Sequence, residues 1–328
     1  MISTKQKYRV HCKVEPSIPI FSKDWWLDAV CGKDNWDVVV VEKGGQIIAS
    51  MPYYMVKRRG RHIVTMPKLT QTMGPWLKYP PNQKYANRLS FEKNVMDAII
   101  NGLPKFDSFS QNFHYSIVNW LPFYWKGFKQ TTRYTYVIDD LSNLEEVEGE
   151  FSHAKRKNIK KAEKIINVQF DLSAKDFYEN HKLTLAKQGE KIVYTCDHFK
   201  NIYTAGYNNK AARTIYAMDA EGNIHAALFV IWDSQSAYDL ISTIDPDFRS
   251  SGAASLLVKE IIKYVSNFTK KFDFEGSMIE NVENSFRQFG TVQKPYFQLT
   301  KVNSPFVKIY QDIRSCGGML RQFVRNKS

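Results

Sequence analysis

Two carboxylic acids stand close together in a strand-like segment of the last third of the chain. Asp273 and Glu275 are two positions apart and alternate with Phe272 and Phe274. Because side chains two apart on a strand point to the same side, the spacing predicts that both carboxyl groups face one site. A carboxylate in such a place can anchor an amine or hydroxyl substrate, or accept its proton. The alternative interpretation is structural, with each carboxylate satisfied by neighbouring backbone amides.

A strand, a turn of small residues and a helix lie just upstream, between residues 237 and 265. The residues placed to contact a ligand there are Ile244, Arg249, Ser250, Ser251, Gly252, Ala253 and Ala254. The free N–H groups at the start of a helix lie at the positive end of its dipole and suit a phosphate. Gly252 and Ala253 would let such a ligand approach the backbone closely. Small residues also suit close helix packing, so the spacing alone leaves both interpretations open.

The remaining polar residues near these segments fit less specific roles. Tyr296 follows Pro295 in the last strand-like segment, and it is a candidate acid toward a leaving group, with core packing as the alternative. Asp245 and Asp247 flank a proline and are expected to shape the turn. The seven histidines show no triad spacing and no serine lies in a Gly-x-Ser-x-Gly motif, so a hydrolase is not favoured.

The chain is strongly basic, with 46 Lys and Arg against 33 Asp and Glu and a net charge of +13. Much of this charge gathers in residues 152–164, where six basic side chains surround Ile159 and Ala162 at helical spacing. Such a helix is either a solvated face or a platform for phosphate or another polyanion, tRNA included.

Cysteine usage and hydropathy exclude several classes of protein. Cys12, Cys31, Cys196 and Cys316 are scattered and have no histidine at ligand spacing, so we expect neither a zinc site nor a disulfide framework. Residues 1–14 lack the apolar core of a signal peptide, and no stretch approaches 18 consecutive apolar residues. The sequence therefore predicts a cytoplasmic protein without a bound metal or a transmembrane segment.

Hydrophobic periodicity predicts an α/β fold with mixed sheets. In the first half we expect a helix from Ser22 to Gly32, hairpins at 36–51 and 53–66, an ordered loop at 66–76, a helix at 82–103 and strands at 108–118 and 130–138. In the second half we expect helices at 152–164, 174–189, 198–207 and 280–289, strands at 168–172, 213–218, 224–232, 237–244, 271–274 and 295–302, and a closing helix at 304–325.

Two further features organise the second half. The helix that follows the small-residue turn carries Val258, Ile261, Ile262 and Val265 at i, i+3, i+4 and i+7, which predicts a buried stripe. Acidic and polar residues near 139–149 mark a boundary. The predicted division is residues 1–140, residues 141–303, and a C-terminal helix, 304–328, that packs back on the first domain.

The turn also resembles a known motif. Arg249-x-x-Gly252-x-Ala254 is similar to the Gln/Arg-x-x-Gly-x-Gly/Ala phosphate loop of the GNAT acyltransferase superfamily, and it lies between a strand and a helix as in that family. There the loop holds the pyrophosphate of acyl-coenzyme A, and the preceding strand lines the acyl carbonyl. The resemblance implies an acyl-CoA co-substrate and two GNAT-like domains, each a mixed sheet flanked by helices.

Residues 52–54, 69–75, 156–162, 272–277 and 285–290 carry a second resemblance. They are similar to segments of the Fem-type peptidyltransferases and of GNAT-like proteins linked to cell-envelope polysaccharides, and together they cover nearly the whole chain. The resemblance implies substrate contacts for Gln71, Ser277 and Arg287. In two respects the chain departs from the Fem pattern. Arg287 replaces a lysine in a turn that is one residue shorter, and the phosphate loop is closer to that of coenzyme A enzymes.

The resulting hypothesis is transfer of an acyl group from acyl-CoA to an amine or hydroxyl of a cell-envelope or polysaccharide precursor by direct attack. Glu275, Asp273 and Tyr296 are its candidate catalytic residues. One alternative is aminoacyl transfer from tRNA, bound along residues 155–164, as Fem proteins use that donor. The other is a GNAT-like protein that has lost catalysis and binds a nucleotide-linked sugar or a protein partner.

Overall fold

The computed structural model describes residues 2–276 and 278–305, and it is built around a 12-stranded mixed sheet. The strands are β1 (Trp36–Lys43), β2 (Gln46–Arg58), β3 (Arg61–Thr65), β4 (Trp76–Leu77), β5 (Ser108–Asn112), β6 (Lys129–Ile138), β7 (Asn167–Phe170), β8 (Ala212–Met218), β9 (Ile224–Trp232), β10 (Ser236–Ile244), β11 (Lys271–Asp273) and β12 (Val292–Val302). Their spatial order is β1-β2-β3-β5-β12-β6-β11-β10-β9-β8-β7, with β4 paired to β2. The predicted α/β class with helix-flanked mixed sheets is confirmed.

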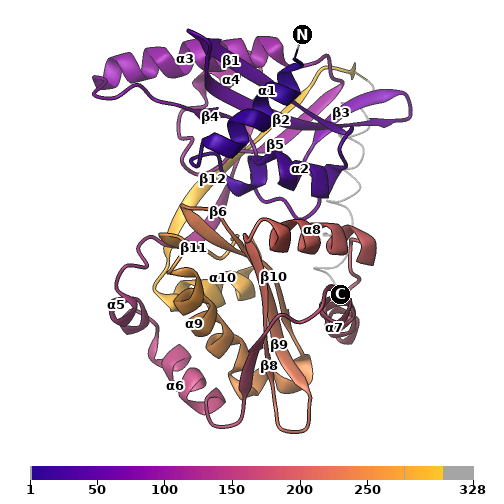
Figure 1. Ribbon diagram of the computed structural model, residues 1–328, viewed down its shortest axis with the longest axis vertical. Helices are drawn as coiled ribbons and strands as arrows, with labels where there is room; N and C mark the ends of the chain where they lie inside the picture. The colour runs from indigo at the N-terminus through magenta and orange to yellow at the C-terminus, as the bar shows by residue number, and fades with distance from the viewer. Residues whose placement is uncertain (1, 277, 306–328) are drawn as a thin grey trace, which may run out of the picture.

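The helices flank this sheet in both halves of the chain (Figure 1). They are α1 (Thr4–Val14), α2 (Asp24–Cys31), α3 (Tyr85–Gly102), α4 (Leu121–Trp125), α5 (Leu144–Gly149), α6 (His153–Ala162), α7 (Ala174–Lys187), α8 (Cys196–Asn208), α9 (Ala253–Val265) and α10 (Glu280–Phe286), with short 3-10 turns η1 (Ile20–Ser22), η2 (Pro246–Ser251) and η3 (Arg287–Phe289). Among the described residues, no helix is long and apolar enough to cross a membrane.

Both predicted hairpins form, but they share one strand. β2 pairs with β1 over its first part and with β3 over its second, so the segments expected at 46–51 and 53–56 are one continuous strand. Gly44 and Gly45 make the first turn with φ of +58° and +75°, a conformation that glycine adopts without steric cost.

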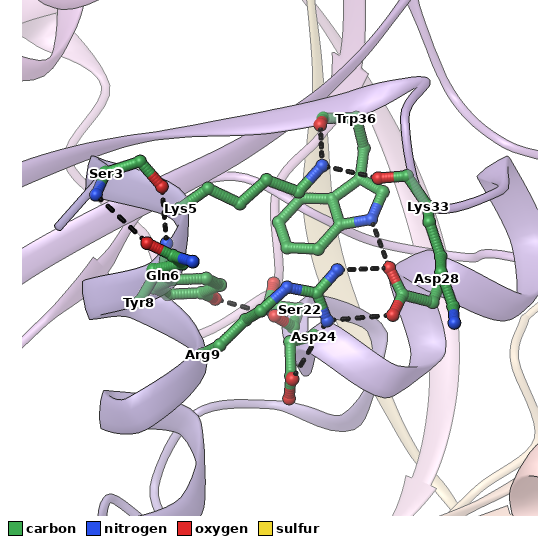
Figure 2. Close-up of polar contacts among 10 residues, drawn as sticks. All are labelled: Ser3, Lys5, Gln6, Tyr8, Arg9, Ser22, Asp24, Asp28, Lys33 and Trp36. Carbon is green, nitrogen blue, oxygen red and sulfur yellow. Dashed lines mark hydrogen bonds and ion pairs between the residues drawn. The ribbon is translucent and has the colours of Figure 1, made fainter.

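The N-terminal helix was not predicted from the sequence. Ser3 and Gln6 form a reciprocal capping box at its start. Figure 2 shows how α1 is clasped to α2 and β1: both terminal nitrogens of Arg9 donate to the Asp28 carboxylate at 2.7 and 2.8 Å. The Lys5 ammonium lies 4.1 Å from the centroid of the Trp36 ring, which is cation–π geometry. These contacts fix the N-terminus on the first half of the sheet.

Helices cover both faces of the second half of the sheet. The predicted stripe of α9 is buried: Val258, Ile261, Ile262 and Val265 are at most 6% exposed and pack in one apolar cluster with β8, β9 and Ile159 of α6. On the opposite face, α7 and α8 pack in a cluster that also contains residues of α2 and β1. In that cluster the rings of Phe21 and Tyr238 are 5.0 Å apart. Apolar packing therefore joins the two halves of the chain.

The last strand returns to the first half of the chain. β12 pairs with β5 on one side and with β6 on the other, and β6 in turn pairs with β11. β6, β11 and β12 thus form the middle of the sheet, between the two lobes in Figure 1. The boundary near residue 140 stays a prediction, and the closing helix expected at 304–328 lies beyond the described residues after Pro305.

Candidate active site

The site is organised by two parallel strands that separate. β10 and β11 pair only over Ser236–Lys271, Ala237–Phe272 and Tyr238–Asp273. β11 ends at Asp273, whereas β10 continues to Ile244. A wedge therefore opens between them beyond Tyr238, and along it no strand of the described residues pairs with the edge of β10 that faces β11. Such a free edge offers backbone hydrogen-bonding groups to an inserted ligand.

Asp273 lies at the vertex of this wedge and is completely buried. Its Oδ1 accepts a hydrogen bond from the Thr135 hydroxyl and one from the Glu275 backbone N–H, the latter at 2.7 Å. Its Oδ2 has no hydrogen-bond partner in the described part of the chain. Burial raises the pKa of Asp273 to about 7, against the lowering effect of those two bonds. This carboxyl group is therefore able to take up or release a proton near neutral pH.

Glu275 is turned toward the same place by an unusual backbone. Its φ is +58°, and Gly276 follows with a φ of +59°. A Cβ at Gly276 would overlap the Tyr134 carbonyl oxygen, so this turn is packed directly on β6. Burial, together with the charges of Asp273 and Asp239, raises the pKa of Glu275 well above its ordinary value. The strand-alternation argument for the carboxyl pair was wrong, because the strand ends at Asp273, and the left-handed turn orients Glu275 instead.

A third carboxyl group, on Asp239 of β10, was missed in the sequence. It is 6% exposed, accepts a hydrogen bond from Ser242 Oγ at 2.6 Å, and leaves Oδ1 without a partner among residues 2–276 and 278–305. Burial raises its pKa to about 6. The available signal was the one charged residue of a strand that is otherwise uncharged, because burying a carboxylate that has no function is costly.

The structure also brings Gln71 and Tyr296 to the carboxyl groups. Gln71 Nε2 lies 3.5 Å from the Thr135 hydroxyl, which donates to Asp273. Tyr296, on β12, is 7% exposed. Its pKa is raised by burial, lowered by Arg133, and raised by the charges of Glu275 and Asp273. Four of the residues predicted from sequence therefore meet at this vertex, although their roles remain predictions.

The predicted phosphate loop lies at the other end of β10. From Asp239 to Ile244 the strand advances five residues, or about 17 Å. The loop then runs through η2 to Gly252, which begins α9 with a φ of +84°. Lys187, at the end of α7, braces this loop through ion pairs of 2.7 Å to Asp245 and to Asp247. As expected, the Asp245 side chain shapes the turn by accepting from the Asp247 N–H.

Of the two interpretations of Gly252, the structure supports close helix packing. A Cβ at this position would overlap the backbone carbonyl of Asn158, so α6 rather than a ligand occupies the space beside it. Ser251 and Ala253 are buried as well, and the Ala253 N–H donates to Ser251 Oγ. Arg249 and Ser250 are exposed, so a ligand would meet the loop on their side.

α6 combines an exposed basic face with one inward lysine. Lys157, Lys160 and Lys164 are exposed, and Lys161 Nζ donates to the Ser250 carbonyl at 2.6 Å. Lys155 instead turns toward α10, where its Nζ lies 2.9 Å from Ser285 Oγ, and burial lowers its pKa to about 8. The exposed part of this helix adjoins the loop and adds positive charge beside Arg249.

Two predicted substrate contacts are not assembled with the others. Arg287 is 60% exposed, donates to Asn284 Oδ1 and lies 3.9 Å from Glu283, so its partners belong to its own turn. Ser277 lies outside the described residues. Across residues 2–276 and 278–305, no three His, Cys, Asp or Glu side chains are placed to hold a metal ion.

A cavity of about 400 Å³ lies between the two lobes, where β10 and β11 begin. Trp76, His114, Tyr115, Tyr238 and Lys271 are among its walls. Burial and then the Asp273 charge raise the pKa of Tyr115, and Tyr238 responds in the same direction to burial, Asp233 and Asp273. Asp273 itself is not among the cavity walls, but its charge contributes to the raised pKa of both wall tyrosines.

Comparison with known proteins agrees with this geometry. Residues 150–276 match the family model described as an acetyltransferase (GNAT) domain, a segment that contains α6, β10, the loop, α9 and β11. No curated protein matches the chain by sequence. The chain is similar in fold to the crystal structure of FemX, with 13% identity and a TM-score of 0.66 over 90% of this chain and 96% of that chain. It is also similar to a conserved protein of unknown function from Bacteroides thetaiotaomicron VPI-5482, with 13% identity and a TM-score of 0.55 over 92% and 98% of the two chains.

The matched segment has the domain type of an acyltransferase. Residues 150–276 are thus similar to a GNAT acetyltransferase domain, and the chain as a whole shares its fold with FemX.

Proposed function

We propose that this protein transfers an acyl group from acyl-CoA directly to an amine or hydroxyl of a cell-envelope or polysaccharide precursor in the cytoplasm. One observation carries the proposal: the β10–β11 wedge has buried carboxyl groups at its vertex, and at its mouth, about 17 Å away along β10, a loop with Arg249 and neighbouring lysines. An elongated thioester donor with a phosphate-bearing end fits that spacing. The acyl carbonyl would lie near Asp273 and the phosphates near Arg249 and Ser250.

In this reaction the acceptor nitrogen or oxygen attacks the thioester carbonyl, a new C–N or C–O bond forms, and the C–S bond breaks. Backbone N–H groups on the free edge of β10 would polarise the carbonyl. Asp273 or Glu275 would take the proton that the acceptor loses, and Tyr296 is the candidate to protonate the leaving thiolate. The pKa of Asp273, raised to about 7, supports such exchange near neutral pH, and burial raises the pKa of Glu275 as well. The acceptor would arrive through the cavity between the lobes.

An aminoacyl-tRNA donor is the second candidate, because α6 presents exposed lysines beside the loop. The two donors make different demands on the surface. Coenzyme A contacts would centre on Ser250 and Arg249, whereas tRNA contacts would extend to Lys157, Lys160 and Lys164 and depend strongly on salt.

Isothermal titration of the purified chain with acetyl-CoA tests the proposal. We expect binding that Ser250→Glu, a change at an exposed position, weakens about tenfold or more through charge repulsion. The matched control is Lys157→Glu, which should leave acetyl-CoA affinity nearly unchanged and weaken tRNA binding in a filter assay. The absence of acyl-CoA binding by the unaltered chain would sink the donor assignment. Binding of acyl-CoA with no product formed from any amine or hydroxyl acceptor would favour the non-catalytic alternative.

A further inference from the structure

The short helix α4 presents apolar side chains to solvent. Leu121, Tyr124 and Trp125 are 49%, 58% and 57% exposed, and their spacing of i, i+3 and i+4 places them on one side of the helix. Val118, just before it, is 69% exposed. The opposite side is formed by Phe123, which is completely buried. Packing among residues 2–276 and 278–305 does not account for such an outward apolar stripe, which is typical of a contact surface.

The stripe is held on a rigid support. The Phe123 ring lies 5.1 Å from that of Phe113 and 5.2 Å from that of Phe128, in edge-to-face contacts. Lys301 of β12 donates from Nζ to the Lys126 carbonyl at 2.7 Å and so ties the end of the helix to the sheet. Because the support is already ordered, little conformational entropy would be lost when the exposed side chains bind a surface.

The segment around the stripe carries basic and no acidic residues, and the Glu92 carboxylate of α3, which accepts from Asn119 at 2.8 Å, is buried and paired with Arg88. No Asp or Glu occurs between Asp107 and Asp139, and this interval contains all of β5, α4 and β6. Lys126 and Lys129 directly follow the stripe and are exposed. A surface that joins aromatic side chains to exposed lysines is complementary to an apolar layer with negative charge at its boundary.

We propose that α4 docks the protein on a membrane surface that contains anionic lipids. Tyr124 and Trp125 would enter the headgroup region, where aromatic side chains with one polar edge are favoured. Leu121 and Val118 would reach the acyl boundary, and Lys126 and Lys129 would lie among anionic headgroups. Each basic residue near such a surface contributes about 1 kcal/mol. The net charge of +13 draws the whole molecule toward the same partner. This inference is independent of the donor or acceptor of the reaction.

Cosedimentation of the full chain with lipid vesicles tests the docking. We expect binding to vesicles of phosphatidylcholine with phosphatidylglycerol, weaker binding as salt rises, and little binding to phosphatidylcholine alone. The double variant Tyr124→Ser/Trp125→Ser should lower the partition coefficient about tenfold or more. Because its two changes are at exposed positions, this variant should still fold, and circular dichroism checks that it does.

A matched control changes exposed apolar residues of the other lobe. Leu183→Ser/Val193→Ser alters side chains that are 54% and 72% exposed, and it should bind vesicles as the unaltered chain does. Equal binding to neutral and anionic vesicles would overturn the proposal, as would loss of binding in the control. Failure to bind either vesicle, with self-association through α4 in sedimentation velocity, would show that the stripe meets a protein instead.

Discussion

Three carboxyl groups crowd the vertex of the wedge. Asp273, Glu275 and Asp239 each have one oxygen without a hydrogen-bond partner in the described residues, and burial raises the pKa of all three. Buried carboxylates without paired cations weaken the folded state, so their presence here is better explained by chemistry than by stability. At the residue scale, the site therefore resembles a proton-exchanging centre more than a structural ion-pair network.

This arrangement makes stability depend on pH in a defined direction. The pKa of Asp273 is about 7 in the folded protein and near 3.8 in the unfolded chain, so between these values the folded state holds a proton that the unfolded state releases. The contribution of Asp273 to stability therefore falls as pH rises from about 4 to about 7. Asp239 and Glu275 act in the same direction.

Asp273→Asn should remove part of this loss of stability at high pH. Urea unfolding at pH 8 should show the variant more stable than the unaltered chain by roughly 1–3 kcal/mol, because a neutral amide replaces a buried charge. At pH 4 the difference in stability between the variant and the unaltered chain should shrink. The variant should also have less acyl transfer activity than the unaltered chain. Glu145→Gln, at an exposed position on α5, is the control and should show no such pH dependence. A variant that is equally destabilised at both pH values would mean that Asp273 is a structural acceptor for Thr135.

At the scale of single elements, α1 shows how a helix without a strong apolar pattern is held in place. Its buried residues are Tyr8 and Cys12, and its polar face is secured by the Arg9–Asp28 pair and by Lys5 above Trp36 (Figure 2). The bidentate pair is partly shielded from water, with the Arg9 side chain 29% exposed. A paired guanidinium in such a position contributes more than an exposed lysine pair does.

Removing the Arg9–Asp28 pair should therefore weaken the packing of α1 against α2. Arg9→Met is expected to lower the free energy of unfolding by about 1–2 kcal/mol, because the partly buried Asp28 carboxylate loses its paired guanidinium. Lys7→Met, which removes the more exposed pair with Glu42, should change it by less than about 0.5 kcal/mol. Thermal unfolding followed by circular dichroism measures both. Equal losses of stability in the two variants would show that the bidentate geometry of the Arg9–Asp28 pair makes no extra contribution.

At the scale of the whole molecule, a continuous sheet and a shared core join the two lobes. β6 belongs to the first predicted domain, yet it lies between β11 and β12 of the second. The apolar cluster that contains Phe21, Trp26 and Tyr238 draws on both parts of the chain as well. A division at residue 140 would cut through both connections.

A fragment of residues 141–328 is accordingly expected not to fold by itself. Without β6, it would expose the paired edges of β11 and β12, which favours aggregation. The full chain should unfold in one cooperative transition in calorimetry, whereas the fragment should show none. If the fragment unfolded cooperatively near the temperature of the full chain, the boundary at 140 would be right and the central strands would be dispensable.

Local sequence patterns determined most of the elements. The hairpins, α9 with its buried stripe and the short strand at Asp273 were predictable because turn residues and the periods of two and 3.6 act within a few residues. The chemistry of the carboxylates was also readable, since Asp273 and Glu275 interrupt an aromatic segment. α1 escaped prediction because contacts with α2 and β1, rather than its own pattern, hold it.

Only the tertiary structure decided how these elements combine into a site. The recruitment of Asp239, the turn that orients Glu275, the cover of α6 over Gly252 and the outward position of Arg287 all depend on chain segments far apart in the sequence. So does the insertion of β12 between β5 and β6. Strand order and burial are set by the packing of the whole chain, and burial is what gives the carboxyl groups their raised pKa values. Residue types therefore indicated the kind of chemistry, and the fold brought the wedge, the loop and the carboxyl groups together in one place.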